Sequence, residues 1–552
     1  MSSTEVRSND VNRSRTSLGT LAFTVILSVL SLAGAALIVF STRRYGVGLS
    51  TDSVGYISAA RNLVAGAGLR LFTGVPLSQW PPLYPALLAA LAYVTRTDPV
   101  SCARGVDVVS FALTLWLSGV LIRTYVRRTP ALCCLGVVAV LTSRVVEEFS
   151  TVALSEVPFY PCVLLFLICA HSYARRTGML SVIGMALSAA AASLLRWPGS
   201  ILILLAILQV LAGRSGVPRR RLLGALGLVS ASAVPLALWL AVTGHAWRYL
   251  STSLHHAGAV RPIITGSSTA GLLLDSLRLV AATVPRWYVH LDLHGKFAAM
   301  HSVSTVILMC VPVGAACLVL SRAGARGVWS VARSFLRRQD ILILFTVLYA
   351  LVHVFMHTTV LLEIDDRELS PIFVPTTVLL LALLDRSTGL LRTSRLRVGA
   401  PAITVSMLCI WLLAPALNAR ARALEQSRRG AWGYSTVEWR ESPTIDFVER
   451  MPASARGALY SNAPDALYIL KSIKARYSPF TAVNYPWWWK TPRPAESFTG
   501  AWPEEGSAIL VWFSGASWRQ SLFTPSELAS KANLDTLAVL RDGTVYAVSP
   551  RK

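Results

Sequence analysis

The chain has 552 residues, of which 54% are hydrophobic and only 14% are charged, and its mean hydropathy is +0.54. A soluble enzyme of this size is excluded, because a water-soluble fold could not bury so much apolar surface. We therefore expect an integral membrane protein for which lipid is the main solvent.

Apolar segments recur along the first three quarters of the chain, separated by short charged or Pro/Gly-containing breaks. Because strands with open edges would leave backbone groups unpaired in lipid, we expect helices. The first segment, residues 18–40, is too long for a signal-peptide core and predicts an uncleaved anchor. The sequence thus predicts an all-α multi-span domain over residues 18–417 with about eleven transmembrane helices, centred near residues 30, 112, 138, 165, 187, 205, 232, 310, 350, 378 and 408.

The formal net charge of +24 is concentrated in arginine clusters that flank alternate apolar segments, as at residues 123–128, 219–221 and 333–338. Such a distribution follows the positive-inside rule and places these ends in the cytoplasm, together with residues 1–17. The clusters also suit contact with anionic membrane lipids, and nucleic-acid binding is not expected. We predict a multi-pass plasma-membrane protein.

On this topology the loops 41–100 and 244–300 and the tail 418–552 lie outside the cell. The tail is more polar, and Asp542-Gly543 between two apolar runs indicates a β-hairpin. The apolar run Ala508–Phe513 is predicted to form a strand, and residues 444–451 and 525–532 are predicted to form helices. We expect a small exported α/β domain.

All eight cysteines lie in or beside predicted spans, which argues against a disulfide framework or a cysteine metal site.

The first outer loop carries the strongest chemical signal. Asp52 lies in the polar stretch Thr51-Asp52-Ser53-Val54-Gly55-Tyr56, directly after the first span and before a predicted helix over residues 53–64. A carboxylate at a membrane surface can act in acid/base chemistry. Asp52 can instead cap the helix by accepting from free backbone N–H groups. The sequence leaves both roles open, and they are compatible.

Several motifs in this loop resemble those of GT-C glycosyltransferases, most nearly the protein O-mannosyltransferase and aminoarabinose transferase branch. The resemblance covers residues 18–215 well and the later spans only in architecture. The motifs are Asp52-x-x-x-Tyr56, Ala59-Ala60-Arg61-Asn62-Leu63, Gly66-x-Gly68, Pro81-Pro82-Leu83-Tyr84-Pro85, Ser155-Glu156-Val157-Pro158-Phe159 and Leu194-Leu195-Arg196-Trp197-Pro198-Gly199.

The resemblance implies a polyprenyl-phosphate-linked sugar donor and transfer to an acceptor at the outer face, with inversion at the anomeric carbon. It makes Asp52 the expected base and Glu156 a second acid, with Tyr56, Arg61 and Tyr84 near the substrate. Glu156 could equally serve as a helix-dipole partner or a surface carboxylate. A divalent cation between Asp52 and Glu156 is weakly indicated, and no cofactor is otherwise expected.

Arginines on the outer side are candidate ligands for the donor phosphate, because guanidinium groups match phosphate oxygens in a bidentate geometry. For Arg196 the alternative is an anchor at the membrane interface. The candidates are Arg196, Arg248, Arg286 and Arg367.

Two histidine patterns invite a metal interpretation, which we do not favour. Six histidines lie in or next to the loop 244–300 without a known ligand spacing. His353 and His357 are four residues apart, but Val354 stands where a zinc-protease motif needs glutamate, so buried histidines with satisfied hydrogen bonds are expected. In the tail, residues 487–489 are tryptophans that suit the headgroup belt better than sugar stacking.

One departure from the family concerns the acceptor. Protein O-mannosyltransferases carry a paired Asp-Glu, whereas Ser53 follows Asp52 here. The acceptor therefore stays open between lipid, polysaccharide and protein. A transporter or flippase of lipid-linked envelope intermediates is the main alternative function, and a scaffold or polymerisation partner is a third. Neither inverted repeats nor mid-membrane charges, which favour transport, are evident.

Overall fold

The computed structural model describes residues 3–212, 218–243, 269–289, 296–338, 340–360, 363–391, 399–479, 502–516 and 522–551. The chain divides into two compact units. Unit 1 comprises Met1–Ser41, Arg104–Val242 and Ser268–Glu425, and unit 2 comprises Thr42–Ala103, Thr243–Ser267 and Gln426–Lys552. The first outer loop thus belongs to the same unit as the tail. The sequence had instead predicted that this loop is part of the membrane domain over residues 18–417.

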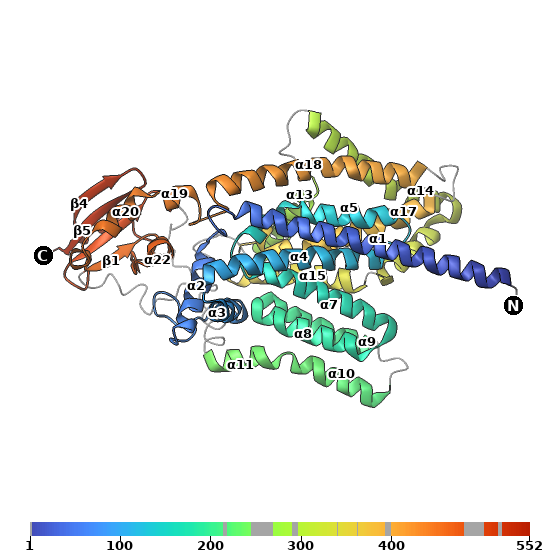
Figure 1. Cartoon of the computed structure of the whole chain (residues 1–552), viewed down its shortest axis with the longest axis horizontal. Helices are drawn as coiled ribbons and strands as arrows, with labels where there is room; N and C mark the ends of the chain where they lie inside the picture. Colours follow the sequence, from blue (N-terminus) through green and yellow to red (C-terminus); the bar gives the residue numbers. More distant parts are fainter. Residues whose placement is uncertain are drawn as a thin grey trace. The chain divides into compact units, whose positions relative to one another are not determined.

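Unit 1 is built from α-helices (Figure 1). Two of its long helices, α4 and α18, continue into unit 2. The helices are α1 (Ser3–Ser41), α4 (Pro99–Tyr125), α5 (Pro130–Leu141), α6 (Arg144–Glu147), α7 (Glu156–Arg176), α8 (Met179–Leu195), α9 (Ile201–Ala212), α10 (Arg219–Ala231), α11 (Val234–Thr243), α13 (Thr269–Arg286), α14 (Lys296–Arg338), α15 (Asp340–Val360), α16 (Asp366–Leu369), α17 (Phe373–Leu391) and α18 (Gly399–Arg429).

The multi-span membrane architecture is confirmed. Within the described residues, eight helices are long and apolar enough to cross a membrane, and the bent pair of Pro130–Leu141 with Arg144–Thr151 gives up to nine. The predicted segments near residues 187 and 205 fall in α8 and α9, which are apolar but shorter, with 17 and 12 residues. Ten of the eleven predicted segments are centred in a helix, and the one near residue 232 is centred at the turn between α10 and α11, which together form one candidate span. The number of membrane crossings stays a prediction.

Small residues let the helices of unit 1 approach closely. A Cβ atom on Gly34 of α1 would lie 2.2 Å from Leu115 of α4, and one on Gly119 of α4 would lie 2.4 Å from Leu27 of α1. Close backbone approach of this kind gives the van der Waals contact that holds helices together in lipid, where water exclusion contributes little.

The loop between α4 and α5 is held by one carboxylate. Asp385, near the end of α17, accepts backbone N–H groups from Arg127 at 3.0 Å, Arg128 at 3.1 Å and Thr129 at 2.7 Å. Asp385 is 4% exposed, so water cannot replace these bonds. The sequence pattern gave no indication of this contact between distant segments.

Unit 2 combines the first outer loop with the tail. The loop contributes α2 (Thr51–Val64) and α3 (Leu83–Thr95), which confirms the helix predicted after Asp52. The tail contributes α19 (Val437–Arg440), α20 (Pro443–Arg450), α21 (Ala453–Arg456), α22 (Pro464–Lys471), α23 (Pro525–Leu528) and a five-stranded sheet of β1 (Ala458–Ser461), β2 (Arg476–Tyr477), β3 (Ala508–Phe513), β4 (Ala532–Leu540) and β5 (Gly543–Pro550).

The sheet has the strand order β2-β1-β3-β5-β4, with β1 parallel to β2 and β3. The antiparallel pair β4–β5 closes at Asp542-Gly543, so the predicted hairpin is confirmed, as is the strand Ala508–Phe513. The helix predicted over residues 525–532 is too long: α23 ends at Leu528, because β4 already begins at Ala532.

Contacts inside unit 2 tie the loop to the tail. Tyr468 of α22 stacks on Phe72, with ring centroids 4.9 Å apart, and the Arg61 guanidinium lies 5.5 Å from the centre of the same Tyr468 ring. The backbone of Leu49 pairs with Trp432 and Tyr434 at 3.0 and 2.8 Å. These contacts explain why chain segments separated by the whole membrane domain form one unit.

We expect Asp385→Ala to lower the free energy of unfolding by at least about 2 kcal/mol, because buried N–H groups lose a charged acceptor. Thermal unfolding in detergent would measure the effect. Asp275→Ala is the matched control, since Asp275 is exposed and pairs with Arg278 of its own helix; its effect should stay within about 0.5 kcal/mol. Equal losses in both variants would contradict a special role for Asp385.

Candidate functional site

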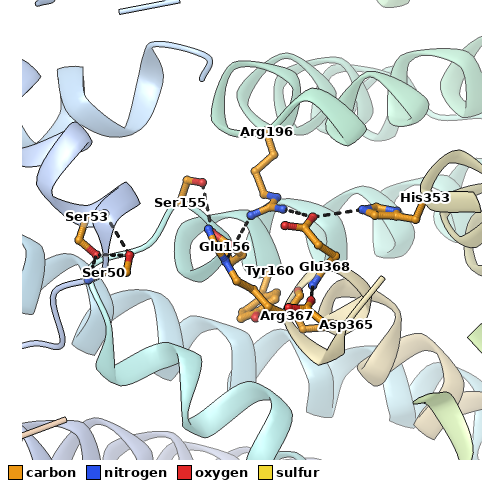
Figure 2. A network of polar contacts seen from close by, with 11 residues as sticks. Ser50, Ser53, Ser155, Glu156, Tyr160, Arg196, His353, Asp365, Arg367 and Glu368 are labelled. Atoms are coloured by element: carbon orange, nitrogen blue, oxygen red, sulfur yellow. Dashed lines mark hydrogen bonds and ion pairs between the residues drawn. The ribbon is translucent and has the colours of Figure 1, made fainter. Parts of the chain in front are cut away.

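A buried cluster of charged side chains lies in unit 1 (Figure 2). Arg196 forms ion pairs with Glu156 and, at 2.6 Å, with Glu368, and Arg367 forms a second ion pair with Glu156. His353 Nε2 lies 3.3 Å from Glu368 Oε2. The Glu156 side chain is fully buried and that of Arg196 is 9% exposed. Residues distant in sequence, from four helical elements, thus meet in one network.

The turn after α8 delivers Arg196 into this cluster. Arg196 has an extended backbone, with φ −146° and ψ 142°, which ends α8 and turns the chain. The following Gly199 lies against α8, where a Cβ would be 2.2 Å from the Ala192 carbonyl oxygen. No larger residue fits there, so the Arg-Trp-Pro-Gly sequence fixes the position of the arginine.

Glu368 is positioned by the cap of α16. Asp365 is the N-cap of this short helix, and its side chain accepts the Glu368 backbone N–H at 2.8 Å. His353 of α15 bonds through Nδ1 with the Tyr349 carbonyl at 2.9 Å. The predicted interpretation of His353 as a buried histidine with satisfied hydrogen bonds is therefore confirmed.

The charges of this cluster balance. Two guanidinium groups, Arg196 and Arg367, face two carboxylates, Glu156 and Glu368, so the formal charges of these four groups sum to zero. Burial of an uncompensated charge costs several kcal/mol, and each group therefore depends on its partners. Because both arginines engage Glu156, this carboxylate is better placed to orient cations than to accept a proton.

Asp52 lies in unit 2, in the first turn of α2. The helix is capped by Ser50: its Oγ accepts the Ser53 N–H at 3.1 Å, while Ser53 Oγ accepts the Ser50 N–H at 3.0 Å (Figure 2). The alternative in which Asp52 caps this helix is therefore wrong. Asp52 itself is half-buried and lies one residue after the start of the helix.

Tyr56 and Tyr84 form the core of the first outer loop. Their rings meet at a centroid distance of 5.1 Å, and the Trp80 ring lies 5.0 Å from that of Tyr56. Tyr56 is 1% exposed and Tyr84 fully buried. Gly55 allows this packing, since a Cβ there would be 2.7 Å from the Trp80 ring. These positions suit shaping of the loop, and their expected contact with substrate stays a prediction.

Arg61 forms an ion pair with Asp98, with Nε 2.8 Å from Oδ2. Burial lowers the pKa of Arg61, but the hydrogen bond and charge of Asp98, helped by Tyr468, outweigh burial and raise this pKa above its ordinary value. Arg61 is therefore a permanent cation within unit 2.

The remaining predicted site residues lie elsewhere. Arg286 donates to the Ala282 carbonyl at 3.1 Å and to Thr283 Oγ1 at 3.0 Å on its own helix. Arg248 and the tryptophans at 487–489 lie outside the described residues, as do five of the six loop histidines, all but His301. No cluster of three or more potential metal ligands occurs among the residues that the structure describes.

Sequence reasoning missed the part played by Glu368. Of the residues in the turn from Glu363 to Glu368, only Arg367 was among the predicted site residues. The spacing of Asp365 and Glu368 is that of an N-cap and the third helical residue, which predicts a helix start but not the contact with Arg196. Two other acidic residues of unit 1 are paired outside the cluster: Glu147 pairs with Arg422 and Glu148 with Arg144.

Neither a scan against protein-family models nor a search of curated proteins gives a match. Solved structures do match. The chain is similar to ArnT, an aminoarabinose transferase from Cupriavidus metallidurans, bound to undecaprenyl phosphate, with TM-score 0.55, 14% identity and coverage of 94% of this chain and 97% of ArnT. The apo state of the same protein matches with TM-score 0.51.

An archaeal oligosaccharyltransferase, AglB from Archaeoglobus fulgidus in complex with an inhibitory peptide and a dolichol-phosphate, matches with TM-score 0.50 and 11% identity, over 89% of this chain and 69% of AglB. Both proteins are GT-C membrane glycosyltransferases. The match spans unit 1 and unit 2 alike, well beyond the residues 18–215 that carried the sequence resemblance. The expected architecture is confirmed: the chain has the GT-C fold.

Proposed function

We propose that the protein is an integral-membrane glycosyltransferase that takes a sugar from a polyprenyl-phosphate donor and transfers it, with inversion, to an acceptor at the outer face of the membrane. The observation that carries the proposal is the GT-C fold over nearly the whole chain. The two neighbours hold undecaprenyl phosphate and a dolichol-phosphate, which supports a lipid-linked donor. The comparisons lend no support to a flippase.

The reaction exchanges one bond at the anomeric carbon for another. The acceptor hydroxyl oxygen attacks this carbon, Asp52 takes the hydroxyl proton, and the bond from the carbon to the phosphate oxygen breaks. The bonding electrons leave with the polyprenyl phosphate. A positioned base contributes about 10² to 10⁴ in rate, and cations near the leaving phosphate stabilise its developing charge.

The buried cluster supplies those cations in this proposal. Arg196 and Arg367 are the phosphate ligands, while Glu156 and Glu368 hold the two guanidinium groups in place before the donor arrives. Electrostatic catalysis depends on such preorganisation, since charges already oriented cost no rearrangement during reaction. Glu156 thus acts as a positioning residue.

We expect Asp52→Asn to reduce transfer from a radiolabelled polyprenyl-phosphate sugar by about 10² to 10⁴ in isolated membranes. The Ser50–Ser53 cap is unaffected by the change, so the amount of folded protein should equal that of wild type. Asp446→Asn, at a half-buried carboxylate of the same unit that lies 3.8 Å from Lys471, is the control and should keep full activity. Equal transfer by wild type and Asp52→Asn would remove Asp52 from the mechanism; no transfer by wild type with any of several donors would overturn the proposed function.

A second prediction separates positioning from chemistry at Glu156. We expect Glu156→Gln to raise the KM for the donor more than it lowers kcat, because the arginines lose an orienting charge while Asp52 remains. The unfolding temperature should fall, since a buried cation is left uncompensated.

Adding Arg367→Gln to Glu156→Gln restores the charge balance of the cluster. The double variant should recover stability relative to Glu156→Gln alone, yet keep the high donor KM because a phosphate ligand is gone. A loss confined to kcat in Glu156→Gln, as large as that of Asp52→Asn, would instead assign Glu156 to the chemical step.

A further inference from the structure

Unit 1 contains a second feature that the proposed reaction does not use. A groove of about 380 Å³ lies between α1, α5 and α18. Its walls are almost entirely apolar, and alanines on α18 keep it open. The lining residues are Ala33, Leu37, Phe40, Leu141, Thr142, Ala416, Ala419, Arg420, Ala423 and Leu424.

The groove lies near one end of the membrane-crossing segments that form it. Phe40 is next to the last residue of the span Gly19–Ser41, and Leu141 is the last residue of α5. The groove shares no helix with the charged cluster, whose members come from α7, the turn after α8, α15 and α16.

Two arginines of α18 near the groove, Arg420 and Arg422, differ in their hydrogen bonds and ion pairs. Arg422 fixes the wall of the groove: its Nε donates to Glu147 Oε2 at 2.8 Å, and its Nη2 reaches the Thr142 carbonyl at 3.5 Å. Arg420 lines the groove and is exposed. Over the described ranges no carboxylate pairs with Arg420, so a cation stands at an apolar recess without a counter-ion from the protein.

We propose that this groove binds an acyl tail of an anionic phosphoglycerolipid, whose phosphate pairs with Arg420. An apolar recess beside one unpaired guanidinium matches the two parts of such a lipid, since arginine pairs with phosphate in a bidentate geometry. A protein helix is a less favourable occupant, because the acidic residue that it would need in order to pair with Arg420 is costly to desolvate. The donor lipid is disfavoured because its phosphate ligands lie on other helices. The site does not depend on the proposed reaction.

Native mass spectrometry of the full chain tests this site, with phosphatidylglycerol and phosphatidylcholine offered in equal amounts after delipidation. We expect wild type to retain phosphatidylglycerol about fivefold over phosphatidylcholine, the preference that one arginine near an anionic lipid provides. Arg420→Gln should reduce the ratio to about one. Arg428→Gln, at an exposed arginine of α18 away from the groove, should leave the preference intact.

Ala419→Leu tests the apolar part, because a leucine side chain at a position that is 3% exposed fills the recess. Retention of both lipids should fall, whereas Ala402→Leu at an exposed position of the same helix should change nothing. Unfolding temperatures equal to wild type show that each variant is folded; should Ala419→Leu unfold, Ala416→Leu replaces it.

Three outcomes would overturn the assignment. The first is an unchanged lipid ratio in Arg420→Gln or no preference in wild type. The second is displacement of phosphatidylglycerol by an equal amount of undecaprenyl phosphate, which would give the groove to the donor. The third is a dimer mass that Ala419→Leu abolishes, which would make the groove a contact between two copies.

Discussion

Charge compensation in a buried cluster is the constraint on which the membrane unit depends. Glu156 is fully buried and holds two guanidinium groups, while Glu368 holds one of them and contacts His353. Removal of any one of these four charges leaves the cluster with a net charge, and an uncompensated buried charge costs several kcal/mol. The cluster therefore fixes α7, the turn after α8, α15 and α16 relative to one another.

The same constraint explains how a membrane enzyme can keep phosphate ligands ready. Unpaired arginines at that depth would be expensive in the absence of substrate, and carboxylates that pair with them make the empty state stable. In the proposed reaction, an incoming phosphate would compete with the carboxylates for the guanidinium groups, so that binding would exchange one set of ion pairs for another. Such an exchange would orient the donor phosphate while the guanidinium groups move little. The proposed transfer requires this preorganisation.

Hydropathy predicted the membrane helices well because the solvent imposes a simple rule: a crossing helix must be apolar over its whole length. The hairpin at Asp542-Gly543 was predictable for a similar reason, since its turn chemistry is local. The pairing of Glu368 with Arg196 spans 172 positions, and no local pattern carries it. The same holds for Asp385, whose contact with Thr129 spans 256 positions. Resemblance placed Arg196 and Glu156 among the candidates, but only the fold brought them together.

Asp52 shows where local chemistry is ambiguous. An aspartate at a helix start suits both a cap and a base, and the sequence offered Ser50, Asp52 and Ser53 within four positions. The serines form a complete capping box, so the helix has no need of the carboxylate as a cap. Capping by the hydroxyl groups of Ser50 and Ser53 leaves Asp52 outside the capping box, in the first turn of α2. The base role of Asp52 belongs to the proposed reaction, and the capping box shows that this role does not compete with the start of α2.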